Sequence, residues 1–432
     1  MSHLSVETLC VQAGYEPKNG EPRVAPLYQS TTYKYDSADY VADLFDLKAE
    51  GHIYTRISNP TLDFFEKKIA ALEGGVAALA TSSGQSANLL AILTLCKSGD
   101  HVIAFNNLYG GTFTLLNSTL KHFGIETTFV DLDSSDEDIE KEIRDNTRLL
   151  FGESLGNPGV RVLDIERFAN LAHSHQLPLI VDNTFPTPCL LRPIEYGADI
   201  VTHSTSKYID GHATAVGGII VDSGKFDWNN PRFACMTDPD PNYHGLSYTA
   251  SFGSLAYITR ARVVFMRDLG STMSPFNAFL TNLGAETLAI RMERHSSNAL
   301  AVAEFLESSP HVEWVSYPLL KSSPDYDLAQ KYLKDGASGV ISFGVKGGIG
   351  EGKSFIDSVK LASLVVHVAD TRTHVLHPAS MTHKQLSKED QVAGGISENM
   401  IRLSVGIENV EDIIKDLSQA LERSQNAPNF RK

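Results

Sequence analysis

Residues 199–208 read DIVTHSTSKY, an apolar run that passes directly into a hydroxyl-rich segment and a lysine. The run 199–203 is typical of a buried strand because it lacks an alternating polar face. Lysines are rarely buried, so Lys207 directly after such a strand is unusual, although it could also extend to solvent. The hydroxyls of Ser204 and Ser206 beside this amine suit a phosphate together with a carbonyl that the amine captures.

Similar apolar runs recur on both sides of this stretch, separated by helical patterns. Strands that alternate with helices and lack a polar face predict an α/β fold, with a mostly parallel sheet covered by helices on both faces. Ligands of such sheets bind at the carboxyl ends of the strands. We predict the other strands at 76–80, 101–105, 127–130, 148–152, 178–181 and 217–221, and helices at 61–72, 85–95, 112–123 and 165–175.

The two ends of the chain differ from this regular middle. The first sixty residues mix prolines and aromatics without a sustained period, so we expect them to pack on another surface such as a partner subunit. After a loop-rich stretch at 222–254, a helical spacing at 299–306 and strand patterns at 339–345 and 400–405 predict a smaller α/β unit. The expected organisation is an N-terminal arm of residues 1–60 that contacts a neighbouring subunit, a large domain of 61–260 and a C-terminal domain of 261–432.

The composition of the 432 residues excludes several classes of protein. With 42% hydrophobic and 21% charged residues the chain is ordinary globular protein. Its 37 Lys and Arg against 52 Asp and Glu give a net charge of −15, which disfavours nucleic acid and anionic membrane surfaces. No apolar run reaches the ~18 residues that a membrane span needs.

The cysteines and histidines give no sign of a metal site. The four cysteines are far apart and none lies in a CxxC pair, which disfavours a disulfide framework and a zinc site and fits a cytoplasmic protein. The pairs at 173/175 and 374/377 lack a matching set of carboxylates, so no metal is predicted.

Two further strand ends carry polar groups that complement Lys207. The strand at 76–80 runs into TSSGQS, a turn that either only caps the next helix or offers free N–H groups to an anion. Asp182 follows the strand at 178–181; it could be a buried acceptor or could keep a cationic ring nitrogen protonated. A phosphate site, a ring-nitrogen partner and an imine-forming lysine together describe pyridoxal 5'-phosphate (PLP).

At this point the sequence resembles the Cys/Met-metabolism PLP-dependent enzymes over nearly its whole length. The motifs that carry the resemblance are YTR (54–56), SG (83–84), LYGG (108–111), ESLGNP (153–158), DNT (182–184), HSTSK (203–207) and RLSVGIE (402–408). The stretches at 8–14, 242–245, 274–280, 291–295 and 377–380 are most similar to the O-acetylhomoserine sulfhydrylase branch.

The resemblance implies fold type I and assigns roles to individual residues. Lys207 would hold the PLP aldehyde, Asp182 the ring nitrogen, and Tyr109 would stack on the ring; these three are the expected catalytic residues. Tyr54 and Arg56 would reach the phosphate of a neighbouring subunit, so that the chain works as a dimer and assembles as a tetramer of dimers. The expected cofactor-binding residues are Tyr54, Arg56, Ser83, Gly84, Gln85, Tyr109, Asn157, Asp182, Thr184, Ser204, Ser206 and Lys207; the expected substrate-binding residues are Arg402, Tyr54, Asn157 and His367.

The activity implied is a γ-replacement in methionine and cysteine biosynthesis, from O-acetylhomoserine and sulfide to homocysteine and acetate, with O-acetylserine as a second donor. Cystathionine γ-synthase and γ-lyase are the alternatives within the family, and a catalytically silent member is an alternative outside enzymes. Methionine γ-lyases usually carry cysteine where this chain has Gly111. The chain also departs from the sulfhydrylases in one loop, where His367 and Ala369 replace an expected Asn and Gly; His367 would either contact the substrate or be inert.

Overall fold

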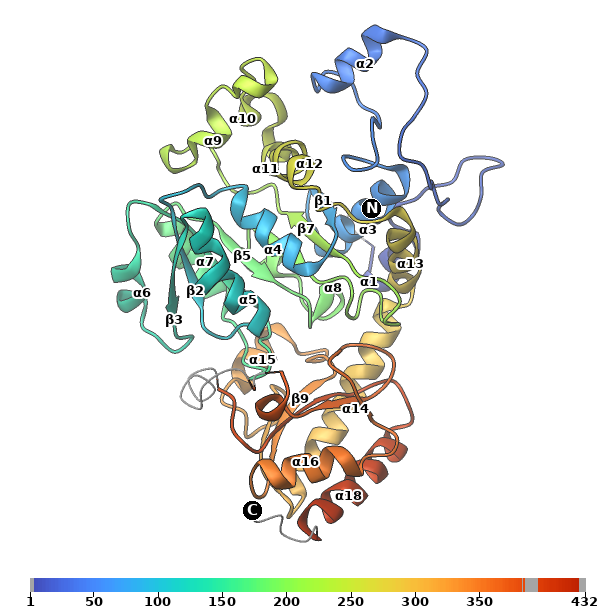
Figure 1. The fold of residues 1–432 in the computed structure, drawn as a ribbon, viewed down its shortest axis with the longest axis vertical. Coiled ribbons are helices and arrows are strands. Elements are labelled where there is room, and N and C mark those ends of the chain that lie inside the picture. Colours follow the sequence, from blue (N-terminus) through green and yellow to red (C-terminus); the bar gives the residue numbers. More distant parts are fainter. Residues whose placement is uncertain (1–3, 383, 385–394, 427–432) are drawn as a thin grey trace.

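The computed structural model describes residues 4–382, 384 and 395–426 and contains two sheets, one in each half of Figure 1. The larger sheet has seven strands in the order β1-β7-β6-β5-β4-β2-β3. Only β7 runs antiparallel to its neighbours β1 and β6, and the remaining pairs are parallel. The sequence-predicted strands are confirmed to within one residue at each end: β1 (Ala77–Thr81), β2 (His101–Phe105), β3 (Glu126–Val130), β4 (Thr147–Glu153), β5 (Leu179–Asp182), β6 (Ile200–His203) and β7 (Gly218–Asp222).

Both faces of this sheet are buried, as the absence of a polar face predicts. Successive residues of one strand enter different cores: Val181 belongs to one apolar cluster and its neighbour Ile180 to the other. The first cluster is covered by α3 (Pro60–Glu73), α7 (Ile165–Ser174) and α13 (Pro275–Glu286) and the second by α4 (Gly84–Leu93) and α11 (Ala256–Arg260). This arrangement confirms the predicted mostly parallel sheet with helices on both faces.

The helix predicted at 112–123 has a different form in the structure. It consists of α5 (Gly110–Thr114), a π turn (Leu115–Thr119) and a 3-10 turn (Leu120–Phe123) that ends at the left-handed Gly124. The predicted loop-rich stretch contains only short helices, among them α9 (Ala234–Thr237) and α10 (Tyr248–Phe252).

The smaller sheet lies in the second half of the chain and has the order β10-β11-β12-β9-β8. Its pairs are antiparallel except β10 with β11. Helix α14 (Leu288–Ser308) runs from the large part into the small part (Figure 1), and buried residues of both sheets belong to one continuous cluster. The elements here are β8 (Val312–Ser316), β9 (Val340–Val345), α16 (Ile349–Ser358), β10 (Ser363–Leu364), β11 (His374–Leu376), β12 (Met400–Ser404) and α18 (Val410–Asn426). The domain limits at 60 and 260 stay a prediction.

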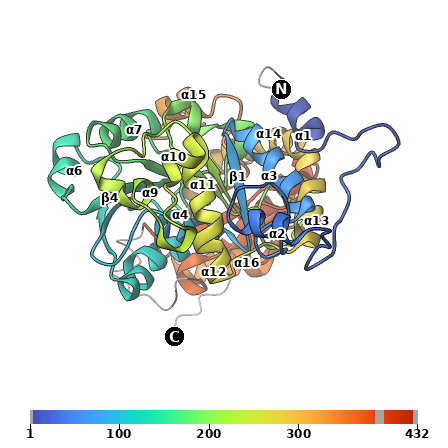
Figure 2. The ribbon, with the colours of Figure 1, turned by 90° about the horizontal axis from the view of Figure 1, so that it is seen from above.

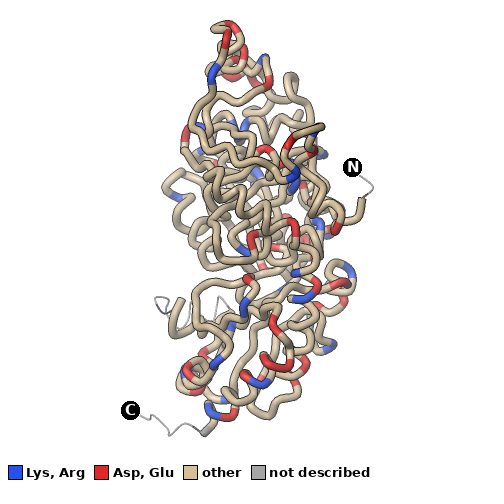
Figure 3. The backbone as a smooth tube through the Cα atoms, turned by 90° about the vertical axis from the view of Figure 1, so that its right-hand side faces the viewer, with Lys and Arg blue, Asp and Glu red and all other residues tan. Residues whose placement is uncertain are grey.

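The N-terminal segment is only partly packed on the rest of the chain. Helix α1 (Val6–Gln12) contacts α3 and α14 and buries Leu9 and Cys10. The chain then leaves the body as an extended loop, which stands clear in Figures 1 and 2, before α2 (Ala38–Phe45). Figure 3 shows basic and acidic residues interspersed along the backbone in that view. Among the described residues, no helix is long and apolar enough to cross a membrane.

A buried polar cluster fixes the ends of β5 and β6. Glu73, the last residue of α3, lies with Oε1 at 2.7 Å from His203 Nε2 and accepts a hydrogen bond of 3.0 Å from Asn183 Nδ2. All three side chains are fully buried. Because Asn183 and His203 belong to the DNT and HSTSK motifs, this cluster fixes the position of both motifs.

We expect Glu73→Ala to lower the free energy of unfolding by about 3 kcal/mol, because the Asn183 amide and the His203 ring would lose their shared acceptor in a dry environment. Urea denaturation followed by circular dichroism measures this. Lys67→Ala, an exposed change on the same helix, is the control and should stay within about 0.5 kcal/mol of the unchanged protein. Equal midpoints for the two variants would contradict the role of the cluster.

Candidate functional site

A cavity of about 390 Å³ lies where the carboxyl ends of the parallel strands face the smaller sheet. It is lined by segments that follow β1, β4, β5 and β6, and by Arg402 from β12. The structure therefore brings together residues as far apart in the sequence as Ser83 and Arg402. The sequence-predicted residues that line it are Ser83, Gly84, Gln85, Tyr109, Asn157, Asp182, Thr184, Ser204, Ser206, Lys207 and Arg402.

The hydroxyl-rich side of the cavity is built around the first turn of α4. Ser83 caps this helix by accepting a hydrogen bond from the Ser86 amide at 3.1 Å. Gly84 is pressed against Ser204, because a Cβ at position 84 would lie only 2.6 Å from the Ser204 Cβ. Ser206 exchanges hydrogen bonds with the backbone of Gly217. Free amides at a helix start and nearby hydroxyls fit an anionic phosphate.

Two carboxyl groups meet at the ends of neighbouring strands. Asp182 accepts hydrogen bonds from Asn88 Nδ2 and the Thr184 amide, both at 3.1 Å. Glu153 pairs with Asp182 in the β4–β5 register, and its Oε1 accepts from the Tyr109 amide at 2.8 Å. Burial, and then the nearby charge of Asp182, raise the pKa of Glu153 well above its ordinary value. Burial and the neighbouring carboxylate therefore favour the protonated form of Glu153.

Glu153 has no predicted role in the sequence, although it opens the ESLGNP motif. The available signal is its position at the end of a buried strand, next to the strand that ends in Asp182. Strand order decides whether two such carboxyls touch, and periodicity does not reveal strand order.

Lys207 is half-buried, and its side chain lines the cavity. Burial, and then the positive charge of Arg402, lower its pKa to about 8. The backbone beside it is fixed from two directions: Arg291 Nη1 donates to the Tyr208 carbonyl at 2.7 Å, and the Tyr208 hydroxyl accepts from the Gly339 amide at 2.9 Å. Because Gly339 precedes β9 of the smaller sheet, both halves of the molecule position this lysine.

Arg402 is 7% exposed and has few partners for a buried guanidinium. Its Nη1 lies 3.5 Å from Asn157 Oδ1, its Nη2 donates to the Val366 carbonyl at 3.3 Å, and its Nε has no hydrogen-bond partner among the described residues. Burial lowers its pKa to about 10, so the group remains charged at neutral pH. A planar cation with a free donor suits the carboxylate of an amino acid.

The Tyr109 ring forms one wall of the cavity and is 47% exposed. Gly111 lies directly beside it, since a Cβ at position 111 would come within 2.5 Å of the ring. The remaining predicted residues lie elsewhere. Tyr54 and Arg56 are exposed and do not line the cavity of this chain; Arg56 Nη1 donates to the Arg267 carbonyl at 3.0 Å. Their predicted role in a neighbouring subunit stays a prediction.

His367 lies beside the cavity, between Val366 and Val368, which line it. Its Nδ1 is 3.3 Å from Nζ of Lys207. Within the described ranges, no group of three His, Cys, Asp or Glu side chains could hold a metal ion.

These groups fit PLP. The first turn of α4, with the serine hydroxyls beside it, suits the phosphate of PLP. The Asp182 carboxylate suits its ring nitrogen, and the Lys207 amine suits its aldehyde. All three groups line one cavity. The Tyr109 wall offers an aromatic surface to a flat ring.

Comparisons with known proteins agree with this reading. Residues 7–422 match the family model described as Cys/Met metabolism PLP-dependent enzyme. The chain is 47% identical over 425 residues to an O-acetyl-L-homoserine sulfhydrylase of Leptospira meyeri, covering 96% of each. It is 49% identical over 420 residues to a homocysteine synthase of Schizosaccharomyces pombe, covering 96% of this chain and 98% of the other.

A crystal structure from Campylobacter jejuni, whose description names O-acetylhomoserine (thiol)-lyase and a pyridoxyl-lysine phosphate, superposes with a TM-score of 0.94. That protein is 40% identical, and the match covers 97% of this chain and 100% of the other. The chain therefore belongs to the family of Cys/Met metabolism PLP-dependent enzymes.

Proposed function

We propose that this chain is an O-acetylhomoserine sulfhydrylase, which uses PLP to replace the acetate of O-acetylhomoserine with sulfide and so forms homocysteine. The observation that carries the proposal is the placement of the Lys207 amine, the Asp182 carboxylate and the Arg402 guanidinium around one cavity. The names of relatives that are 47% and 49% identical over nearly the whole chain support the choice of substrates.

Arg402 binds and orients the substrate. Its charge and unpaired Nε are available to the α-carboxylate of the amino acid, and Asn157, which lies beside it, narrows the position of that group. A bidentate contact of this kind fixes direction as well as distance, so the Cα–H bond is presented to Lys207.

Bound PLP supplies an electron sink that stabilises negative charge on the carbon atoms next to the substrate nitrogen. Asp182 would pair with the ring nitrogen of the cofactor and favour its protonated form, and Tyr109 would offer an aromatic surface to the ring. Ser83, Gly84, Gln85, Ser204 and Ser206 hold the phosphate, and Thr184 holds the Asp182 carboxylate in place. Burial raises the pKa of Glu153, which favours its protonated form beside Asp182.

Lys207 moves the protons. With a pKa near 8 its amine is partly neutral at physiological pH. It can therefore remove the proton from Cα, and it can then remove a proton from Cβ and later return one there. The Cγ–O bond to acetate breaks and a Cγ–S bond to sulfide forms, after which the amine returns the proton. Sulfide arrives as a substrate, so no cysteine of this chain takes part.

The proposal includes the assembly. The exposed positions of Tyr54 and Arg56, outside this chain's cavity, support a dimer in which they reach the phosphate bound by the neighbouring subunit. The extended arm and its exposed aromatic residues Tyr28, Tyr40 and Phe45 offer apolar surface for that contact. We propose a tetramer of such dimers, located in the cytoplasm.

O-acetylserine is the second donor that we propose, and relatives named homocysteine/cysteine synthase at 46% and 44% identity support it. The γ-lyase alternative is disfavoured by position 111, where a side chain would collide with the Tyr109 ring.

Product analysis tests the proposed reaction directly. The purified holoenzyme should form homocysteine and acetate in equal amounts from O-acetylhomoserine and sulfide, as measured by mass spectrometry. Cysteine in place of sulfide should give little cystathionine, and omission of any acceptor should give little 2-oxobutanoate. Dominant cystathionine would assign the chain to the synthases and dominant oxo acid to the lyases.

Lys207→Ala should reduce turnover by a factor of about 1,000 or more, because it removes both the covalent anchor of the cofactor and the base. The yellow absorbance of covalently bound cofactor should also disappear. Lys121→Ala, which changes an exposed lysine outside the cavity, should keep both properties. Normal turnover in the Lys207 variant would rule out the proposed role.

Arg402→Ala should raise KM for O-acetylhomoserine at least about 30-fold, since it deletes the charged partner of a buried carboxylate. The KM for sulfide should change much less. Arg423→Ala, on the exposed face of α18, is the control. An unchanged KM for the amino acid would show that another group binds its carboxylate.

A further inference from the structure

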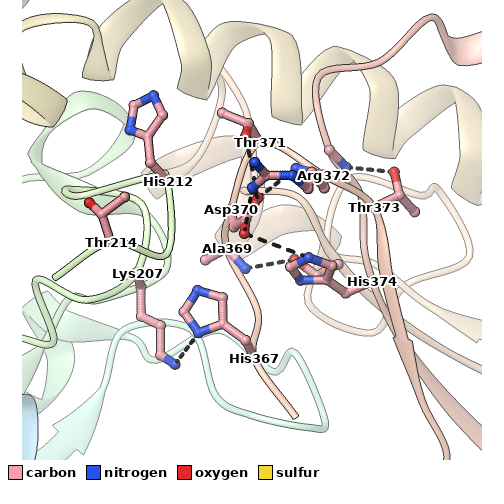
Figure 4. Close-up of polar contacts among 12 residues, drawn as sticks. Lys207, His212, Thr214, His367, Ala369, Asp370, Thr371, Arg372, Thr373 and His374 are labelled. Atoms are coloured by element: carbon pink, nitrogen blue, oxygen red, sulfur yellow. Dashed lines mark hydrogen bonds and ion pairs between the residues drawn. The ribbon is translucent and has the colours of Figure 1, made fainter. Parts of the chain in front are cut away.

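The amine of Lys207 has a neutral partner. Figure 4 shows its side chain directed at the His367 ring, with Nζ 3.3 Å from Nδ1. Among the described residues no carboxylate contributes to the pKa of Lys207. The two groups come from different halves of the chain, because Lys207 follows β6 and His367 lies between β10 and β11 of the smaller sheet.

The protonation of His367 follows from its surroundings. Burial, and then the charges of Lys207 and His374, lower its pKa to about 4, against the opposing effect of Asp370 and Asp210. The ring is therefore neutral at pH 7. If Nδ1 accepts a hydrogen bond from Nζ, the ring proton resides on Nε2, which is buried and has no partner among the described residues.

The loop that carries His367 is tied to the substrate-binding strand. The Ala369 amide donates to Ser404 Oγ of β12 at 2.7 Å, and the Val366 carbonyl accepts from Arg402 Nη2. Ala369 has a φ of 68°, a left-handed conformation that non-glycine residues rarely adopt. These contacts on both sides of His367 limit where its ring can lie.

A neutral acceptor solves a particular problem for a catalytic lysine. A carboxylate at this distance would hold Lys207 as an ammonium and raise its pKa, which would weaken it as a base. With no partner, the flexible side chain would sample many rotamers whenever it is free. An imidazole restrains the amine without adding a charge.

We propose that His367 is a positioning residue for Lys207, whose Nζ donates a hydrogen bond to His367 Nδ1 whenever the amine is not bonded to the cofactor. This inference rests on the proposed function and deepens it. The proton taken from the substrate Cα goes to Nζ, and the resulting ammonium donates to Nδ1 while the imidazole keeps its single proton. His367 thus holds the amine beside the carbon atoms between which it must move.

The test compares two kinds of replacement in the holoenzyme. His367→Leu removes the acceptor at similar size, and His367→Asn keeps an oxygen near the position of Nδ1. We expect kcat to fall about tenfold or more in the leucine variant, with KM for O-acetylhomoserine within about threefold, because only the orientation of the base is lost. The asparagine variant should recover most of kcat. Leu364→Ala, an exposed change in β10, is the control.

A second readout does not depend on the reaction. In the cofactor-free chain, Lys207 is acetylated with acetic anhydride at a series of pH values, and the modified peptide is measured by mass spectrometry. Since only the neutral amine reacts, the pH dependence reports the titration of Lys207. Loss of the acceptor should move the midpoint about 0.5 to 1 pH unit lower in the leucine variant, since the ammonium form loses a hydrogen bond. Asparagine should restore it. His367→Ala serves as a second acceptor-free variant if leucine impairs folding.

Unchanged kcat and an unchanged midpoint in the acceptor-free variants would overturn the inference. So would a rise in KM alone, which would assign His367 to the substrate, or an asparagine variant no better than leucine. Failure of the proposed function looks different: the unchanged holoenzyme would form no homocysteine from O-acetylhomoserine and sulfide, while the acetylation midpoint of Lys207 in the cofactor-free chain would still respond to changes at His367.

Discussion

The site depends on one constraint: an amine must be kept away from water without an opposite charge beside it. Lys207 meets this constraint because the large sheet delivers it at the end of β6 and the smaller sheet closes over it. Arg402, which faces the same cavity, adds a positive charge and lowers the pKa of the amine further. The contact between Tyr208 and Gly339 joins the two halves at this point, so the separation between lysine and arginine is set by the packing of both sheets.

The same principle of unequal environments separates the two carboxyl groups. Asp182 and Glu153 are register partners on adjacent strands. Asp182 accepts hydrogen bonds from Asn88 and Thr184, and Glu153 accepts from the Tyr109 amide and the Thr112 side chain. At Glu153 burial outweighs these hydrogen bonds and raises the pKa, which favours the protonated form of this carboxyl.

The large sheet could be predicted because each of its strands is a short apolar run bounded by helical patterns, and its strand ends carry the polar motifs. The direction of β7 could not be predicted, because a short apolar run has the same sequence pattern whether its strand is parallel or antiparallel to its neighbours. The site residues near Lys207 were predicted one strand at a time. The contact of His367 with Lys207 was not predicted, because it joins two loops about 160 residues apart. The sequence predicts that His367 either contacts the substrate or is inert. Tyr54 and Arg56 stay untested, as their predicted site lies on a second copy of the chain.

The close contact between Gly111 and the Tyr109 ring determines what a larger residue at position 111 would do to the cavity. The Tyr109 ring can lie this close to residue 111 because glycine has no Cβ. Introduction of cysteine at 111 would bring its Cβ within 2.5 Å of the Tyr109 ring, so the ring would have to move. Because Tyr109 is 47% exposed, its ring has room to move, so a side chain at 111 would act on the cavity by displacing its aromatic wall.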